Sequence, residues 1–446
     1  MSINTEVMES FARLWVWRYI RDKLPWYYEV STNRKPAKYL IAARVPVDEK
    51  FRELSEGDLW REFDNALGEF LSLWGRVRNN EVDIRSIPRA TPSLLDLVVE
   101  ITRRMIRHCE FCEWRCRVDR TGGRRLGVCM LDTTSRVATY FHHMGEELPL
   151  RGTMGSGTIF FTSCNMRCAF CQNADISRDR LNGVPMTPRQ LASVAIMLRL
   201  EGVHNINWVG GEPTPHLHNI AEAINLMARE GIKVLDDLTD EEYEGILMVK
   251  SDPFMYRFSR DWAFYGGEVN VPMLWNSNMY MTESTMKLLR VLMDIWLPDF
   301  KYGNDKCAFR ISRTPRYFEV VSRNHKLIYE WGEDVIIRHL VMPGHVEDDT
   351  KPVLEWIAKN MPGVLVNIMD QYRPENETDP HSRNYNPEFR ELTRRPSREE
   401  LMEVYRYARS LGLNFEIISF EKKMDIAYLG DEDSLMDRIK DNGNAY

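Results

Sequence analysis

In about the first hundred positions, hydrophobic residues recur at intervals of three and four, the spacing of one face of an α-helix. A first helix is expected over Met8 to Lys23, ended by Pro25, and a second over Leu59 to Trp74. A third should begin at Thr91-Pro92-Ser93, which combines a capping residue with a proline. We therefore expect residues 1–107 to form a mostly helical extension. Its many aromatic residues build a small core or, alternatively, a surface for a partner.

The pattern changes after Arg151, where short apolar runs rich in β-branched and aromatic residues alternate with helical stretches. Alternating strands and helices are typical of a parallel sheet with crossover helices. Polar residues follow each run, and α/β barrels bind ligands at the carboxyl ends of their strands. The sequence therefore predicts an α/β fold, a partial (β/α)6 barrel of TIM type. The six expected strands are Thr158 to Ser163, His204 to Val209, Met273 to Trp275, Ile295 to Leu297, Val335 to Val341 and Val364 to Met369.

The remaining segments complete the expected domain organisation. Residues 108–150 form a cysteine-containing segment, 151–385 the barrel core, and 386–446 a C-terminal extension with helix and strand. About forty residues near 231–269 lengthen one connection of the core beyond the usual loop. We expect this insertion to form a lid or an extra subdomain. Its aromatic residues are Phe254, Tyr256, Phe258, Trp262, Phe264 and Tyr265.

Composition narrows the range of functions. The chain has 446 residues, a net charge of −7 and no long blocks of like charge, so neither nucleic acid nor an anionic membrane is indicated as a partner. The apolar stretch Leu14 to Ile20 is too charged around its edges for a signal peptide and too short to span a membrane. We therefore expect a cytoplasmic protein. Seven of the eight cysteines fall into two tight groups, which in a reducing compartment indicates metal ligation.

Three cysteines, Cys164, Cys168 and Cys171, follow the first predicted strand with the spacing C-x3-C-x2-C. A strand that delivers three thiolates to one short loop suits an iron–sulfur cluster. Three ligands leave one iron of a four-iron cluster open, and a substrate or cosubstrate can bind there. The alternatives are half of a zinc site or unrelated buried thiols. A structural zinc ion, however, takes four ligands and usually paired C-x2-C sequences.

The other group is Cys109, Cys112, Cys116 and Cys129, in a segment with turn glycines and five arginines. Four thiolates suit either a structural zinc ion or a second, fully ligated iron–sulfur cluster, and the sequence does not separate these two. Because four protein ligands leave no open position, we expect a structural role for this segment. Cys307 stands alone in the sequence and is predicted to be a buried or neutral thiol.

Polar strand ends supply further candidate residues. Gly210-Gly211-Glu212-Pro213-Thr214 follows the second strand, and its glycines let backbone groups approach a ligand while Glu212 can accept a hydrogen bond from an ammonium group. By itself this sequence predicts only a turn. Asp299 and Lys301 are two residues apart and so share one face of a strand, where a simple surface ion pair is the alternative. Equivalent strand ends carry Asn276, Ser277, Arg338 and His339.

Taken together, these motifs resemble those of radical S-adenosylmethionine (SAM) enzymes, in which a C-x3-C-x2-C loop holds a 4Fe-4S cluster. Within that family, Cys109 to about Pro374 resembles the uncharacterised archaeal and bacterial homologues of pyruvate formate-lyase activating enzyme. This range is well over half of the chain. The shared stretches, in order after the four-cysteine segment, are G-S-G-T-I-F-F, F-C-Q-N, G-G-E-P-T-P-H, W-N-S-N, L-P-D-F-K-Y, R-H-L-V-x-P-G and N-I-M-x-Q-Y.

The resemblance implies that SAM chelates the open iron through its amino and carboxylate groups. The reduced cluster then cleaves SAM to a 5′-deoxyadenosyl radical. Two departures from the family matter: the insertion at 231–269, and the absence of a histidine beside Gln371-Tyr372. Better-studied activating enzymes have a SAM-contacting histidine late in the barrel, so Asn367 or Gln371 is expected to replace it. The implied contacts to SAM are Gly210, Gly211, Glu212, Pro213, Thr214, Asn276, Asp299, Lys301 and Arg338.

The predicted function is therefore that of a radical SAM oxidoreductase that abstracts hydrogen from an unknown substrate under anaerobic conditions. It requires an external one-electron donor such as ferredoxin or flavodoxin. Kinship to activating enzymes adds the formation of a glycyl radical in a partner protein. The alternatives are modification of a small molecule, a peptide or RNA and, from another class, a non-catalytic scaffold whose cysteine groups bind zinc.

Overall fold

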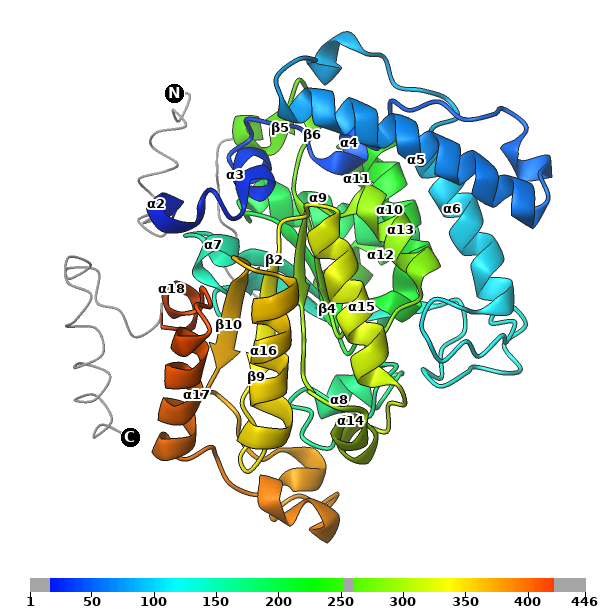
Figure 1. Cartoon of the computed structure of the whole chain (residues 1–446). Coiled ribbons are helices and arrows are strands. Elements are labelled where there is room, and N and C mark those ends of the chain that lie inside the picture. The colour runs from blue at the N-terminus through cyan, green and yellow to red at the C-terminus, as the bar shows by residue number, and fades with distance from the viewer. Residues whose placement is uncertain (1–16, 252–259, 421–446) are drawn as a thin grey trace.

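The computed structural model describes residues 17–251 and 260–420. Several predicted features lie outside these residues: the first half of the helix expected from Met8, the insertion aromatics Phe254, Tyr256 and Phe258, and the extension beyond residue 420. The described residues form a curved parallel sheet with helices on its outer side, and a helical extension lies against one flank (Figure 1).

Six parallel strands follow one another around the sheet in chain order, which confirms the predicted partial (β/α)6 barrel. The fourth and fifth strands meet through two isolated parallel bridges, Trp296 with Val335 and Asp299 with Arg338. The polar ends of all six strands therefore point to the same edge, as parallel strands require. These strands are β2 (Ser156–Phe161), β4 (Ile206–Gly210), β7 (Met273–Ser277), β8 (Ile295–Pro298), β9 (Ile336–Leu340) and β10 (Leu365–Met369).

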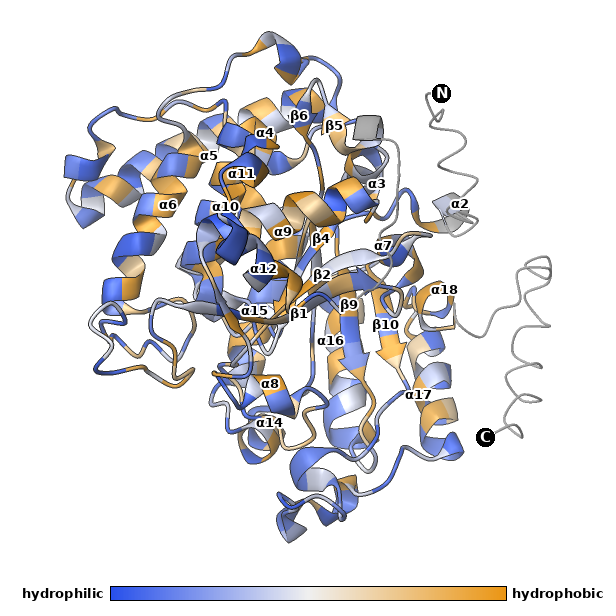
Figure 2. Ribbon diagram, turned by 180° about the vertical axis from the view of Figure 1, so that it is seen from behind, coloured by the Kyte–Doolittle hydropathy of each residue, from blue (hydrophilic) through white to orange (hydrophobic). Residues whose placement is uncertain are grey.

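Crossover helices cover the outside of the barrel. Figure 2 shows hydrophobic residues along the strands and polar residues mainly on the outward side of the helices. The helix expected after Thr187 begins there, because the Thr187 side chain accepts from the backbone N–H of Gln190, whose own side chain accepts from the Thr187 N–H. The helices are α9 (Pro188–Glu201), α10 (Leu217–Glu230), α13 (Glu283–Leu292), α15 (Tyr317–Glu330), α16 (Lys351–Asn360) and α17 (Arg398–Ser410).

The sequence pattern did not reveal one long strand, β1 (Ser135–His143). It pairs antiparallel with β2 on one side and with the short β3 (Val184–Met186) on the other, so it covers the free edge of the barrel sheet. Charged and polar residues interrupt its apolar positions, and its burial alternates only in part. A strand that lies partly exposed at an edge does not need the continuous apolar run of the central strands.

The N-terminal extension is helical, as predicted, but Pro25 begins a helix rather than ending one. Only the short α2 (Trp17–Ile20) lies within the described part of the first expected helix, and Pro25 occupies the first turn of α3 (Pro25–Ser31). Proline suits that position because its fixed φ fits a helix and its missing N–H has no partner to lose there. The other helices are α4 (Lys38–Ala42), α5 (Glu56–Arg78) and α6 (Leu94–Met105), with α6 packed on α10.

Buried polar contacts attach this extension to the barrel. The carboxylate of Asp294, which precedes β8, accepts hydrogen bonds from Trp26 Nε1 (2.8 Å) and from the backbone N–H of Lys38 (2.9 Å). The Lys38 ammonium pairs with Glu333 in a fully buried ion pair. Burial raises the pKa of Asp294 to about 6. The extension and the barrel thus share one interior.

Shorter elements occupy the connections. The described parts of the insertion contain α11 (Lys233–Asp236), α12 (Asp240–Leu247), β5 (Phe264–Tyr265) and β6 (Glu268–Val269), and α11 and α12 pack on α9. In the C-terminal extension up to residue 420, α17 is followed by α18 (Glu416–Ser419), and Asn414 forms a single parallel bridge with β10. Connections near the strand ends contain α7 (Leu148–Arg151), α8 (Ala174–Ser177) and α14 (Asp305–Ser312).

Candidate functional site

The three-cysteine loop starts where β2 ends. Ser163 adopts a positive φ of 68°, which turns the chain out of the strand, and Cys164 follows it directly. The loop is then held from outside by α14: the backbone N–H of Arg167 donates to Ser312 O (3.1 Å), and that of Ala169 donates to Ile311 O (2.9 Å). The cysteines therefore sit on backbone that the fold fixes.

A cavity of about 240 Å³ opens beside this loop. Its wall contains Cys164, Cys168 and Cys171 and residues from the carboxyl ends of β4, β7, β8, β9 and β10. Most of the residues that the sequence singled out thus meet in one place. The members of the predicted SAM site that line it are Gly210, Gly211, Glu212, Asn276, Asp299, Lys301 and Arg338.

The surroundings of the cysteine sulfurs suit thiolate ligands. The backbone N–H of Met166 lies 3.3 Å from Cys164 Sγ, and Asn278 Nδ2 lies 3.7 Å from the same atom. Burial raises the pKa of both Cys164 and Cys168, and the neighbouring Lys301 ammonium opposes the rise at Cys168. N–H donors and a nearby cation favour the charged form of sulfur. The donor set of three thiols around one cavity therefore fits a cluster with three protein ligands.

The glycines after β4 are required by the chain itself. Gly210 has a φ of +138°, and a Cβ atom there would lie 2.2 Å from the backbone nitrogen of Phe161. A Cβ on Gly211 would lie 1.8 Å from Ser163 O. Side chains at either position would collide with backbone, so the end of β4 packs directly against the start of the cysteine loop. The sequence led us to expect that these glycines let backbone approach a ligand. In the structure, they let the end of β4 approach the end of β2 and the cysteine loop.

Glu212 is buried and satisfied by protein donors. Its Oε1 accepts from the Thr214 hydroxyl (2.6 Å) and from Ser277 Oγ (2.7 Å), and its Oε2 accepts from the backbone N–H of Asn278 (3.0 Å). Burial raises its pKa, and these hydrogen bonds oppose the rise. Thr214 therefore lies behind the cavity wall, where its hydroxyl supports Glu212. Pro213 is part of the turn that positions Thr214. The carboxylate links β4 to β7 and retains capacity on Oε2 for one more donor.

Asp299 and Lys301 project from the end of β8 on the same face, as their spacing predicts. Lys301 Nζ lies 2.5 Å from Asp299 Oδ2, and both side chains line the cavity. Burial alone would lower the pKa of Lys301, but Asp299 and the Cys168 sulfur raise it. A fixed, charged donor and acceptor therefore stand opposite the cysteines.

Arg338 is held by two glutamates that the sequence reading missed. Its Nε donates to Glu147 Oε1 (2.8 Å), and its Nη2 pairs with both Glu146 and Glu147. Burial opposes the charge on Arg338, but the two carboxylates raise its pKa far above the ordinary value. Its Nη1 lies 3.5 Å from Asn276 Oδ1 at the cavity. The two glutamates precede α7, far from β9 in sequence, and no local pattern marked them.

The structure shows where His339 lies and which of Asn367 and Gln371 faces the cavity. His339 is fully buried and bonds to Phe300 O (2.7 Å) and Thr350 Oγ1 (2.9 Å), so it supports the β8 and β9 connections. Near the end of β10, Asn367 Nδ2 donates to Glu147 Oε1 (2.8 Å), whereas Gln371 lines the cavity. Of the two residues expected to replace a late histidine, Gln371 is the one that faces the cavity.

An asparagine pair connects the two cysteine groups. Asn278 Nδ2 donates to Asn165 Oδ1 (2.8 Å), and the Trp114 indole N–H donates to Asn165 O (2.7 Å). Trp114 lies in the four-cysteine segment, where Cys112 forms a β-bridge with Met281, three residues beyond Asn278. Asn165 was not among the predicted residues, although its place between Cys164 and Cys168 is a signal that could have identified it.

The four-cysteine segment also contains a buried cation. Arg120 is 1 % exposed, and its Nη1 lies 3.8 Å from Cys109 Sγ and donates to Pro215 O (2.9 Å). Within residues 17–251 and 260–420, its hydrogen-bond partners are carbonyl oxygens and this sulfur, with no carboxylate among them. A buried guanidinium needs a counter-charge. Metal-bound thiolates would provide one, so the segment fits an anionic metal centre.

A three-cysteine loop at the mouth of a (β/α)6 barrel, facing strand ends rich in polar groups, defines an iron–sulfur enzyme with an open metal position. Residues 158–357 match the model of the radical SAM superfamily. The chain is also 34 % identical over 398 residues to an uncharacterised protein, MJ0674, of Methanocaldococcus jannaschii, covering 88 % of this chain and 98 % of that protein. The chain belongs to the radical SAM superfamily and is an enzyme.

Solved structures give weaker similarities. A domain of pyruvate-formate lyase-activating enzyme from Bacteroides vulgatus has 15 % identity and a TM-score of 0.26, covering 32 % of this chain and 80 % of that domain. Streptococcus suis SuiB bound to S-adenosylmethionine has 13 % identity and a TM-score of 0.37, covering 57 % of this chain and 48 % of SuiB. These scores are too low to carry an argument, and family membership depends on the sequence matches.

Membership implies a 4Fe-4S cluster and SAM as cofactors, and an external electron donor. It overturns the alternative of a non-catalytic zinc scaffold, because members of this superfamily are enzymes. Among the described helices, none combines the length and the apolar character needed to cross a membrane.

Proposed function

We propose that this enzyme cleaves SAM reductively at a 4Fe-4S cluster held by Cys164, Cys168 and Cys171, and that it abstracts hydrogen from a substrate bound at the barrel mouth. When bound, the cluster and SAM supply a 5′-deoxyadenosyl radical. The observation that carries this proposal is the single cavity shared by the three cysteines, which follow β2, and the ends of β4, β7, β8, β9 and β10.

Different residues around the cavity are suited to bind different parts of SAM. Asp299 and Lys301 offer an acceptor and a donor on one side of the cavity, suited to the amino and carboxylate groups or the ribose of SAM. The backbone of Gly210 and Gly211 forms the adjoining wall. Glu212, Ser277 and Asn278 hold β4 and β7 together beneath it, so this part of the wall is rigid. The barrel walls exclude water and oxygen from the radical.

Arg338 and Asn276 complete the proposed site from β9 and β7. Because Glu146 and Glu147 neutralise Arg338, we propose that it orients Asn276 and shapes the cavity instead of carrying the main charge contact to SAM. Gln371, which reaches the cavity from the end of β10, takes the place of the absent late histidine.

We further propose that the four-cysteine segment holds a second iron–sulfur cluster, with a structural zinc ion as the alternative. The buried Arg120 supports a negatively charged centre there. The path from Trp114 through Asn165 to Cys164 supports an electron-transfer role, because the two centres would be linked by one short hydrogen-bonded route. A ferredoxin or flavodoxin in the cytoplasm would supply the electron.

The substrate is proposed only by class. The resemblance to activating enzymes favours a backbone glycine of a partner protein, and modification of a small molecule, a peptide or RNA is the alternative. Transfer of deuterium into 5′-deoxyadenosine separates them. Label carried by glycine in a partner would support the first, and label from a small compound would support the second.

Two measurements test the cofactor proposals. Cys164→Ala should lose both the SAM-cleaving activity and the iron of one cluster after anaerobic reconstitution; a variant that keeps both would contradict the proposal. Mössbauer spectra of wild type and of a Cys109→Ala/Cys112→Ala variant count the clusters. A fall from two clusters to one supports the second cluster, whereas one cluster in both proteins, with zinc lost from the variant, supports zinc.

A further inference from the structure

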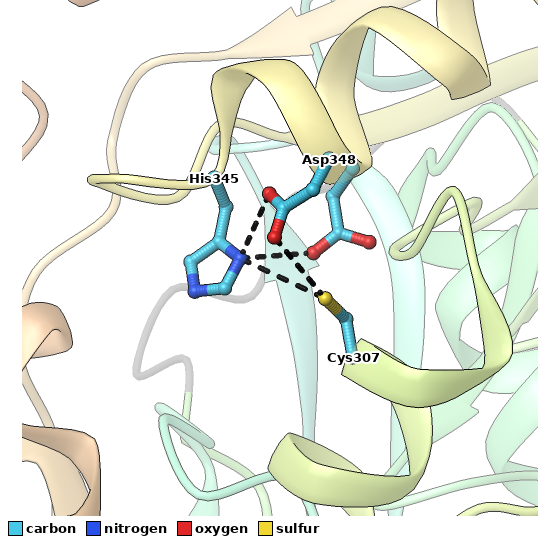
Figure 3. A group of neighbouring side chains, drawn as sticks. Cys307, His345 and Asp348 are labelled. Carbon is cyan, nitrogen blue, oxygen red and sulfur yellow. Dashed lines mark hydrogen bonds and ion pairs between the residues drawn. The ribbon is translucent and has the colours of Figure 1, made fainter.

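Outside the cavity, four side chains form a compact cluster that the sequence did not suggest. Cys307 belongs to α14, while His345, Asp348 and Asp349 lie in the turn and single π-helical turn η7 (Val346–Thr350) after β9. One sulfur, one imidazole nitrogen and two carboxylate oxygens all lie within 4.8 Å of one another (Figure 3). Cys307, which stands apart from the other cysteines in the sequence, therefore has potential metal ligands beside it in the fold, and the thiol is buried as predicted.

The four atoms converge on a common centre. His345 Nδ1 lies 3.1 Å from Asp349 Oδ2, 3.2 Å from Asp348 Oδ1 and 3.9 Å from Cys307 Sγ. Cys307 Sγ lies 3.5 Å from Asp348 Oδ2. Around one tetrahedral zinc ion, bonds of about 2.0–2.3 Å place neighbouring ligand atoms about 3.3–3.8 Å apart. The observed separations of 3.1–3.9 Å lie around that spacing, and Asp348 directs one oxygen toward His345 and the other toward Cys307.

The carboxylate of Asp349 gives independent support for a ligand here. The residue is completely buried, and its Oδ1 accepts from the backbone N–H of Gly303 (2.9 Å) and from Asn304 Nδ2 (3.2 Å). Its Oδ2 points at the cluster; among the described residues it accepts no well-aligned hydrogen bond, and its ion-pair partner is His345 Nδ1 at 3.1 Å. When His345 Nδ1 carries no proton, this buried carboxylate oxygen has no donor, which is costly. A bound cation would satisfy this oxygen.

The surrounding contacts hold the four side chains in place. Asn304 Oδ1 accepts from the backbone N–H of Cys307 (2.8 Å), and its Nδ2 also donates to Asp348 O (2.7 Å). On the far side of the imidazole, His345 Nε2 lies 3.3 Å from Arg310 Nη2 and 3.8 Å from Glu391 Oε1. Such outer contacts orient metal ligands in known sites. Arg310 also offsets part of the negative charge.

We propose that Cys307, His345, Asp348 and Asp349 bind one zinc ion in a closed, structural site. Thiolate, imidazole and carboxylate are the ligands that zinc accepts together, and four protein ligands leave no catalytic position. The ion ties the connection after β8 to the turn after β9. It also fixes α14, whose Ile311 and Ser312 carbonyls hold the three-cysteine loop. Zinc at this point thus rigidifies the support of the cluster.

The competing arrangement has no metal. Burial opposes the charged form of His345, but Asp349, Cys307 and Asp348 around it raise its pKa to about 10. An imidazolium between two carboxylates would then account for the cluster as an ion pair. The two arrangements differ in a measurable way, because only the first retains zinc through Cys307.

Zinc content of the full-length, iron-reconstituted chain provides the test. After equilibration with zinc and gel filtration, Cys307→Ser and Asp349→Asn should each contain about one zinc per chain less than wild type. The same difference should appear when both cysteines Cys109 and Cys112 are replaced by serine, which separates this site from the four-cysteine segment. Cys307→Ser should also lose cluster iron faster during dialysis.

A spectroscopic measurement detects the thiolate ligand directly. In the Cys109→Ser/Cys112→Ser background, cobalt should give a thiolate-to-metal charge-transfer band that zinc displaces and that Cys307→Ser removes. Equal zinc content with and without Cys307, or no such cobalt band, would overturn the proposal and leave the ion-pair arrangement. SAM cleavage is measured separately, so failure here does not affect the proposed function.

Discussion

Asn278 Nδ2 donates a 2.8 Å hydrogen bond to Asn165 Oδ1, and the same Nδ2 lies 3.7 Å from Cys164 Sγ. One amide thereby connects the end of β7 with a residue inside the cysteine loop and with a cysteine sulfur. Since Trp114 donates to Asn165 from the four-cysteine segment, this relationship joins the two cysteine groups through side chains of the barrel. Asn278 is thus placed to influence both the position and the electronic state of the proposed cluster.

Replacement of Asn278 by alanine should lower the reduction potential of the proposed cluster. Hydrogen bonds to ligand sulfur are among the factors that set such potentials. Loss of about 1 kcal/mol of stabilisation corresponds to roughly 40 mV for one electron. Redox titration followed by electron paramagnetic resonance measures this shift. Asn65→Ala, at an exposed position of α5, is the matched control and should leave the potential unchanged; equal potentials in all three proteins would contradict the role given to Asn278.

Gly211→Ala should destabilise the fold and lower cluster incorporation. The added Cβ would lie 1.8 Å from Ser163 O, so the start of the cysteine loop must move. Gly68→Ala in α5 is a control with the opposite expected effect on stability, because no atom of residues 17–251 and 260–420 lies within 4 Å of a Cβ placed there. There alanine should stabilise the helix by about 0.5–1 kcal/mol. Thermal unfolding and iron content are the measurements, and a Gly211→Ala protein with normal values of both would refute the close packing.

Lys301→Met should weaken SAM binding without removing the cluster. A charge-assisted hydrogen bond contributes about 1.5–3 kcal/mol, so the dissociation constant for SAM should rise roughly 10- to 100-fold. Equilibrium dialysis with the iron-loaded protein measures this constant. Asp299→Asn keeps the size of its side chain but loses its charge and should also weaken binding. Unchanged affinity in both variants would exclude these two residues as SAM contacts.

Asp294 should make stability depend on pH. Its pKa rises on folding from 3.8 to about 6, mainly through burial. A raised folded-state pKa gives a stabilising contribution that is complete below the unfolded-state pKa and disappears as pH rises through about 6. Between pH 5 and 7 this contribution should fall by about 1 kcal/mol.

Asp294→Asn tests this dependence. The variant should be less stable than wild type, because the amide cannot satisfy all of the backbone donors around position 294. The gap in unfolding free energy between the two proteins should narrow as pH rises from 5 to 7. Parallel pH profiles would show that Asp294 does not change its protonation over this interval. Urea unfolding at each pH provides the data.

The local pattern of the chain was sufficient for the fold class and for the central chemistry. Six apolar runs that end in polar residues predicted a parallel barrel with a site at its carboxyl edge, and each run became a strand. The spacing of Cys164, Cys168 and Cys171 predicted a common cradle because these residues share one loop. Capping at Thr187 was equally local, since it involves only the next turn of chain.

Features made by distant residues could not be predicted in this way. Glu146 and Glu147 hold Arg338 across nearly two hundred positions, and Asn165 meets Asn278 across more than one hundred. The sequence did not predict the edge strand β1. One of its two pairings is with the distant β3, and its buried and exposed residues do not alternate regularly. Contacts between residues so far apart leave no repeat or regular spacing in the sequence from which they could be predicted.

What the sequence by itself determined was the order of strands and helices and the three thiols of one loop, because periodicity and spacing act over a few residues. Tertiary structure alone decided which carboxylates neutralise Arg338, why Gly211 must lack a side chain, and that Cys307 lies beside His345. The physical reason is that the barrel brings the ends of separate strands to one edge. Charges, sulfurs and amides that are far apart in the chain become neighbours only there.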